Sequence, residues 1–107
     1  MIQYSFGEIV VLPFSYTDLR SEKRRPAIVL LDADDGDVLV ARITSKKNLS
    51  PFEVAIENWD SVGLLVPSFI RVHKLITIEK TLVLKSLGMI DKFDTQNLRE
   101  TFHRMIP

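Results

Sequence analysis

The sequence predicts a mainly β fold, a small and strongly bent antiparallel sheet or barrel with one helix at its C-terminal end. Five or six short segments of apolar or alternating residues are separated by turn residues along most of the chain, a pattern typical of antiparallel sheets. Near the C-terminus the apolar residues change to helical spacing. With 107 residues, the chain has the length of one domain, which we expect to span residues 1–107.

A hairpin is predicted at the centre of this sheet. Its strands are the apolar runs Ala27–Leu31 and Val38–Ala41, and the turn Asp34–Asp37 joins them. Apolar runs bounded by turn residues are typical of buried strands. In an antiparallel pair, the residues before the first strand lie beside the residues after the second. Arg24 and Arg25 are therefore expected near Thr44, Ser45 and Lys46, at the end away from the turn.

The other elements follow in order from their local patterns. Residues 7–13 form a first strand that Pro13 ends, and a polar loop, Phe14–Arg25, follows it. Residues 52–56 and 68–78 alternate as half-buried strands do. From Thr81 the spacing predicts a short helical turn closed by Gly88.

The last helix is predicted to begin at Asp91 or Asp94, either of which can accept hydrogen bonds from the free amides of its first turn. Spacings of three and four residues along this helix give one apolar stripe. The stripe contains Leu98, Thr101, Phe102 and Met105.

Composition excludes several classes of protein. The chain has no cysteine, which excludes disulfides and thiolate metal sites. Its N-terminus does not resemble a signal peptide, and no apolar stretch is long enough to cross a bilayer. We therefore expect a cytoplasmic protein without membrane contact.

The charges are balanced in number but not in placement. There are 14 cationic and 14 anionic side chains, so no net charge attracts nucleic acid. However, aspartates gather at the predicted hairpin turn, and cations gather in three segments away from it. Such a layout can hold an anionic ligand on one face of a neutral protein.

Three blocks of sequence, in order and at matching spacing, resemble the MazF/PemK-type toxins of type II toxin–antitoxin systems. GEIVVLPFSYTDLRSEKRRPAIVLL resembles the start of these proteins, and DGDVLVARITSK resembles their second block. VGLLVPSFIRVHKLITIEKTLVLKSLGMID resembles their third block. The resemblance covers about Gly7 to Met105.

This resemblance implies an SH3-like barrel of the CcdB/Kid/MazF type with a C-terminal helix. It also implies a homodimeric toxin that cleaves single-stranded mRNA sequence-selectively, without a metal or other cofactor, to 2′,3′-cyclic phosphate and 5′-hydroxyl ends. A cognate antitoxin would block the RNA groove.

Metal-independent RNA cleavage needs a base, an acid and a cation that stabilises charge on phosphorus. The resemblance assigns the cation to Arg25, which Pro26 biases toward an extended backbone. A guanidinium is always charged and suits bidentate contact with phosphate. The resemblance assigns phosphate binding to Thr44. The alternatives are a solvated arginine and an ordinary threonine at the end of a strand.

Arg71 matches a second catalytic cation of some family members, which carry an aspartate two residues later. Here that position is His73, which shares one face of the predicted strand with Arg71. Its imidazole can act as base or acid near neutral pH, or it can be a bystander on a half-exposed strand. Other members also have a histidine in the loop before the arginine, and this chain has none there.

The remaining cations and one hydroxyl are predicted to follow the RNA backbone, and Phe14 and Tyr16 to stack on bases. A solvated surface, or a buried position for Phe14, is the alternative. The predicted RNA-binding residues are Arg20, Lys23, Arg24, Arg42, Ser45, Lys46 and Lys47.

Two other functions compete with RNA cleavage. The same barrel could bind RNA or a protein without cutting, which the zero net charge and the missing loop histidine favour. It could also poison a gyrase, as a structurally related toxin does, although the matches at Arg25, Thr44 and Arg71 argue against that function.

Overall fold

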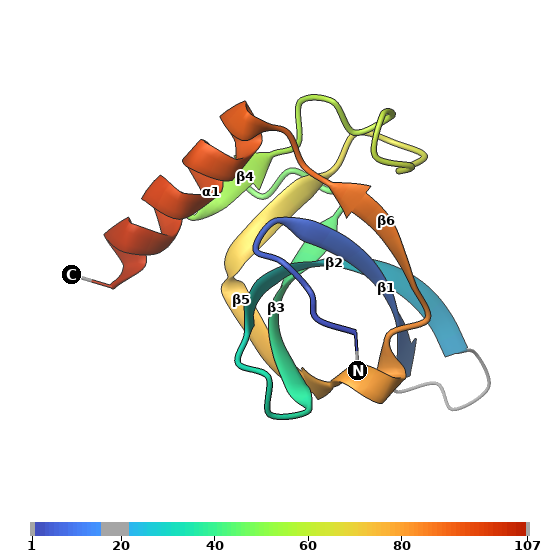
Figure 1. Cartoon of the computed structure of the whole chain (residues 1–107). Helices are drawn as coiled ribbons and strands as arrows, with labels where there is room; N and C mark the ends of the chain where they lie inside the picture. The colour runs from blue at the N-terminus through green and yellow to red at the C-terminus, as the bar shows by residue number, and fades with distance from the viewer. Residues whose placement is uncertain (1, 16–21, 107) are drawn as a thin grey trace.

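The computed structural model describes residues 2–15 and 22–106 and confirms the mainly β fold with one C-terminal helix (Figure 1). Its strands form a bent antiparallel sheet in the order β4-β5-β3-β2-β1-β6, and α1 packs against β4 and β5. The strands are β1 (Glu8–Ser15), β2 (Glu22–Asp32), β3 (Asp37–Thr44), β4 (Glu53–Ala55), β5 (Phe69–Glu79) and β6 (Lys85–Met89). The helices are the 3₁₀ helix η1 (Lys80–Leu82) and α1 (Lys92–Met105).

The central hairpin is confirmed, and its sheet is buried on both faces. Along β2, Ile28 and Leu30 belong to one apolar cluster, whereas Ala27 and Val29 belong to another. Alternate side chains of a strand point to opposite faces, so both faces of β2 are covered. This explains why the sequence shows a continuous apolar run here instead of an alternating one.

The first strand and the loop after it differ from the prediction. Pro13 lies inside β1, opposite Arg24, and β2 already begins at Glu22. Proline is tolerated there because β6 pairs with β1 only as far as Val11. Beyond that residue no described strand pairs with this edge of β1, so the missing amide hydrogen breaks no ladder bond there. Residues 22–25 are thus part of a strand and not of a loop.

The predicted helical turn closed by Gly88 is also wrong. The 3₁₀ helix η1 ends at Leu82, and Gly88 lies within β6, opposite Ile9. The strand pairing shifts by a residue between Ile9 and Val10, and Gly88 has a φ of 126°. A positive φ suits a glycine at a β-bulge as well as one at a helix end.

The helix α1 begins and packs as predicted. The carboxylate of Asp91 accepts a hydrogen bond from the Asp94 amide at 2.8 Å, which caps the first turn. Leu98 and Thr101 are buried, and Phe102 and Met105 pack against the same apolar cluster. No helix within residues 2–15 and 22–106 is long and apolar enough to cross a membrane.

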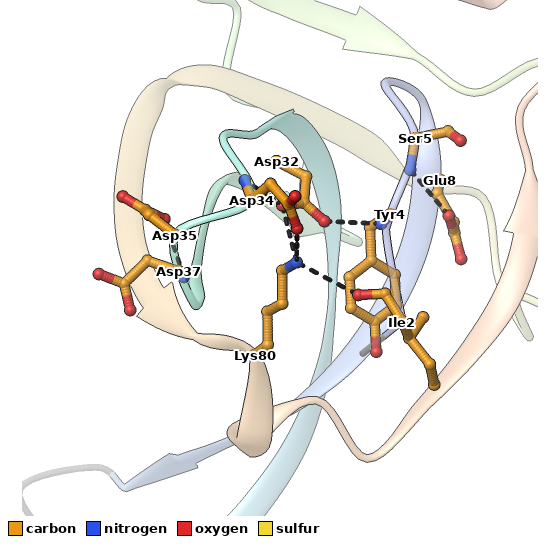
Figure 2. A network of polar contacts seen from close by, with 9 residues as sticks. All are labelled: Ile2, Tyr4, Ser5, Glu8, Asp32, Asp34, Asp35, Asp37 and Lys80. Atoms are coloured by element: carbon orange, nitrogen blue, oxygen red, sulfur yellow. Dashed lines mark hydrogen bonds and ion pairs between the residues drawn. The ribbon is translucent and has the colours of Figure 1, made fainter.

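An ion pair at the β2–β3 turn joins three distant segments (Figure 2). The Lys80 ammonium lies 2.9 Å from an Asp32 carboxylate oxygen, and their side chains are only 6% and 1% exposed. Lys80 also donates to the Ile2 carbonyl at 3.2 Å, and Asp32 accepts from the Tyr4 amide at 2.7 Å. In addition, the Lys80 amide donates to the Gly36 carbonyl. We call the ion pair of Asp32 and Lys80, with these hydrogen bonds, the lock. It ties η1 and the N-terminal segment to the turn.

The lock shifts both pKa values in the directions that favour the charged forms. Burial alone would raise the pKa of Asp32, but hydrogen bonds from the Tyr4 amide, Lys80 and the Asp34 amide lower it below 3.8. The hydrogen bond to Asp32 raises the pKa of Lys80 above 10.5, against the effect of burial, and the nearby aspartates add to the rise. Both groups therefore stay charged through the neutral range.

Asp94 is a buried carboxylate whose charge opposes folding. Burial raises its pKa above 3.8 despite the hydrogen bond from the Glu57 amide, and the carboxylates of Asp91 and Glu57 raise it further. One of its oxygens, Oδ1, is buried without a hydrogen-bond partner in residues 2–15 and 22–106. A group with a raised folded-state pKa contributes stability below its unfolded pKa, and loses it as the pH rises through the folded pKa.

We therefore expect Asp94→Asn to melt at a temperature at least as high as the wild type near pH 7, because the amide oxygen can still accept from Glu57. The advantage is expected to vanish well below pH 3.8, where the wild-type carboxyl is protonated. Thermal melts followed by circular dichroism at both pH values measure this difference. A lower melting temperature for the variant at neutral pH would contradict the prediction.

Candidate functional site

A pocket of about 340 Å³ lies at the end of the hairpin away from its turn. The ends of β2 and β3, the segment 63–68 and β6 surround it. Its polar lining consists of Arg24, Arg25, Thr44, Ser45, Ser68 and Lys85. Its apolar lining includes Val11, Pro26, Ile43, Leu64, Val66 and Leu87.

The hairpin brings Arg25 and Thr44 together, as its predicted geometry requires. Ala27 on β2 pairs with Arg42 on β3. Arg25 lies two residues before Ala27, and Thr44 lies two residues after Arg42, so both residues reach the same end of the antiparallel pair. A half-buried guanidinium and a half-buried hydroxyl thus line one pocket.

The Thr44 hydroxyl is oriented by its own backbone. Its oxygen accepts a hydrogen bond from the Lys46 amide at 3.2 Å. A hydroxyl also has one hydrogen to donate, and among the described residues it has no acceptor. Thr44 can therefore donate to an anionic oxygen that enters the pocket.

Arg71 and His73 do not line this pocket, but they lie on a neighbouring part of the sheet. Phe69 on β5 pairs with Thr44, and Arg71 pairs with Arg42. Residues two apart on a strand share a face, so Arg71 and His73 lie on the same face as Thr44. Arg71 and His73 are partly buried and alternate with the buried Ile70 and Val72, which fits this arrangement.

This face carries two arginines side by side. Arg42 and Arg71 are direct cross-strand partners, and like charges in that arrangement repel. Every ion pair found within residues 2–15 and 22–106 involves Lys80, at the turn end. An anionic ligand such as a phosphate would relieve the repulsion between these arginines.

Two polar atoms on this face are buried and have no hydrogen-bond partner among the described residues: Nε of Arg71 and Nδ1 of His73. The ring of His73 packs at a tilt against Phe52, with 6.1 Å between ring centroids. Buried polar atoms without partners are rare in folded proteins. Both atoms lie on the face that carries the paired arginines Arg42 and Arg71.

The predicted RNA-binding residues fall into three groups. Arg24, Ser45, Lys46 and Lys47 are exposed at the pocket end, and Arg42 is half-buried. The side chains of Lys23 and Phe14 are outside what the structure describes, although both residues pair in the β1–β2 ladder. Arg20 and Tyr16 lie outside the described residues altogether.

Sequence reasoning missed part of the pocket wall. Lys85 adds a cation from β6, and Leu64, Leu65 and Val66 add apolar surface from an irregular segment. The spacing of apolar residues in that segment fits neither a helix nor a strand. The only signal in the sequence that could have located it is the alternating pattern of β5, which follows it. No cluster of three His, Asp or Glu side chains suited to a metal ion occurs in the described parts of the chain.

The family model of PemK-like, MazF-like toxins of type II toxin–antitoxin systems matches residues 5–106. The chain belongs to this toxin family. A comparison with curated proteins gave no match.

Solved structures of MazF-like toxins share the fold of this toxin at low sequence identity. An endoribonuclease from a Mycobacterial species, in complex with its cognate antitoxin, has a TM-score of 0.77 at 15% identity, covering 95% of both chains. MazE–MazF from Deinococcus radiodurans has a TM-score of 0.77 at 19% identity, covering 98% of this chain and 97% of that one. The Mycobacterium tuberculosis toxin MazF-mt6 has a TM-score of 0.70 at 20% identity, with 89% and 93% covered.

These likenesses confirm the predicted fold class, the small antiparallel barrel with a C-terminal helix. Two of these similar structures are complexes of a toxin with its antitoxin.

Proposed function

We propose that this toxin is a metal-independent endoribonuclease that cleaves single-stranded mRNA at selected sequences. The observation that supports it best is the pocket shared by Arg25 and Thr44. Family membership and the likeness to endoribonucleases from Mycobacterial species support it as well.

The proposed reaction is a transfer within the RNA. The 2′-oxygen next to the scissile bond attacks phosphorus, and a base takes its proton. The bond from phosphorus to the 5′-oxygen breaks, and an acid protonates that oxygen. The products are a 2′,3′-cyclic phosphate and a 5′-hydroxyl, so neither an outside nucleophile nor a redox partner is consumed.

Each candidate residue has a role in this proposal. Arg25 stabilises the extra negative charge on the phosphoryl oxygens, and Thr44 donates its hydroxyl hydrogen to one of them. Arg71 supplies a second cation, and His73 acts as acid or base because its Nδ1 has no partner in the described structure.

The exposed cations around the pocket would bind the RNA backbone on either side of the scissile phosphate. They are Arg24, Lys46 and Lys47, with the half-buried Arg42 and the hydroxyl of Ser45. Lys23 and Arg20 complete the proposed set from the sequence.

We further propose that the toxin is a cytoplasmic homodimer of single-domain subunits and is inhibited by a cognate antitoxin. Large apolar side chains remain exposed on the single chain, among them Leu65 at 92%, Met89 at 48% and Leu84 at 47%. Exposed apolar surface of this kind is typical of protein interfaces. Sedimentation of the purified chain tests the dimer.

An assay with a 5′-labelled single-stranded RNA in the presence of excess EDTA tests the reaction. We expect discrete cleavage products whose 3′ ends resist phosphatase until acid opens the cyclic phosphate. Binding without new RNA ends would contradict cleavage and favour the binding-module function. Cleavage that stops when metal is chelated would contradict the proposed mechanism.

A further inference from the structure

We propose that Asn48 and Glu53 are positioning residues of this site, holding the segment 45–51 against Thr44 and Arg71. The inference rests on the proposed ribonuclease function. It starts from three hydrogen bonds that follow one another along the segment, which we call the clamp. The Lys46 amide donates to the Thr44 hydroxyl oxygen at 3.2 Å, and Nδ2 of Asn48 donates to the Lys46 carbonyl at 2.8 Å. The Asn48 amide donates to Oε2 of Glu53, also at 2.8 Å.

The first consequence concerns the Thr44 hydroxyl. A hydroxyl can rotate freely unless one of its lone pairs is engaged. The Lys46 amide engages one, so the remaining lone pair and the hydrogen point elsewhere. The side chain of Asn48 holds the Lys46 carbonyl, which belongs to the next peptide group, so Lys46 is restrained on both sides of its Cα. Asn48 thereby sets the direction in which Thr44 can donate to a phosphate.

The second consequence concerns Arg71. Glu53 on β4 is the cross-strand partner of Arg71 on β5, an arrangement in which opposite charges commonly pair. No ion pair joins these two side chains; instead, the Glu53 carboxylate accepts the Asn48 amide. The Glu53 carboxylate is thus engaged by Asn48 and forms no ion pair with Arg71, which leaves the guanidiniums of Arg71 and Arg42 for an anionic ligand.

The backbone of this segment is strained at the residue between the two clamped positions. Leu49 has a φ of 42° and is 88% exposed. A left-handed backbone is costly for a leucine, and such residues persist where their surroundings hold them, often at functional sites. The hydrogen bonds of Asn48 and Glu53 on either side supply that restraint.

Steady-state cleavage of a labelled RNA by purified variants tests the proposal, combined with a double-mutant cycle against Thr44. We expect Asn48→Ala and Glu53→Ala each to lower kcat about 10- to 100-fold with little change in KM, since misplaced catalytic groups cost rate more than binding. We expect Asn48→Ala to cause no further loss in a Thr44→Ala background, because residues that act as one unit are non-additive.

Two further variants separate positioning from other roles. Glu53→Gln keeps an oxygen that accepts the Asn48 amide, so it should cleave within about threefold of the wild type. Asn58→Ala is the matched control, because it removes an exposed asparagine hydrogen bond, the one to Asp91, from a turn outside the pocket lining. It should leave kcat unchanged.

Three results would overturn the inference while leaving the proposed function intact: additive losses in the double mutant, a loss in Glu53→Gln as large as in Glu53→Ala, or wild-type kcat in Asn48→Ala. A wild-type protein that cuts no RNA would instead remove the proposed function and this inference together. Amide hydrogen exchange at Lys46 adds a readout without substrate: exchange unchanged in Asn48→Ala also contradicts the clamp.

Discussion

Arg25→Ala is expected to reduce RNA cleavage at least about 1,000-fold while leaving the fold intact. Removing one donor that stabilises a developing oxyanion commonly costs on the order of 100- to 1,000-fold. In the proposed mechanism the lost group also carries the positive charge that offsets the negative charge on the phosphoryl oxygens. Arg25→Lys should restore little, because an ammonium cannot make the bidentate contact of a guanidinium.

Cleavage rates should be compared with those of Arg99→Ala, which removes an exposed arginine from α1, outside the pocket lining. Circular dichroism checks that each variant is folded. Wild-type cleavage by a folded Arg25→Ala variant would exclude Arg25 from the mechanism. Equal losses of cleavage rate in the two variants would show that cleavage depends on the total positive charge of the protein and not on the position of Arg25.

Lys80→Met is expected to lower the melting temperature by on the order of 10 °C near pH 7. Methionine keeps the length and apolar stem of the side chain but leaves the buried Asp32 carboxylate without its cation. An uncompensated buried charge destabilises far more than loss of an exposed ion pair. Lys92→Met, at an exposed position of α1, provides the control.

The pH dependence of this loss follows from the two pKa shifts. The lowered pKa of Asp32 means that its contribution is present above pH 3.8 and lost as the pH falls below that value. The raised pKa of Lys80 means that its contribution is present below pH 10.5 and lost as the pH rises beyond it. The melting temperatures of wild type and Lys80→Met should therefore converge in acid. A constant difference down to about pH 2 would contradict this assignment.

The hairpin could be predicted from the sequence because burial on both faces leaves a clear trace, the uninterrupted apolar run Ala27–Leu31. From this run, the turn after it and the second apolar run Val38–Ala41, the positions of Arg25 and Thr44 at one end follow by the geometry of antiparallel strands. The C-terminal helix could be predicted for a similar reason, since its cap and apolar stripe are local patterns.

Gly88 shows where local patterns fail. A positive φ serves a helix C-cap and a β-bulge equally well, and only the pairing of β6 with β1 distinguishes them. Pro13 is a comparable case. A proline ends a strand only where a neighbouring strand would accept a hydrogen bond from the backbone N–H that proline lacks.

The pocket wall and the clamp could not be predicted, because both depend on contacts between distant or irregular segments. Nothing in the sequence of the segment 63–68 or at Lys85 indicates that they face Arg25. Likewise, the pairing of Glu53 with Arg71 depends on the register between β4 and β5. The family resemblance supplied the candidate residues, and the register supplied their neighbours.

The lock between Asp32 and Lys80 lies at the hairpin turn (Figure 2), whereas Arg25 and Thr44 lie at the opposite end of the same hairpin. A harmless, folded form of the toxin should therefore be obtainable by changing Arg25 alone. Bacteria could then produce this form in quantity, and once immobilised it would serve as bait to test cell extracts for the proposed antitoxin.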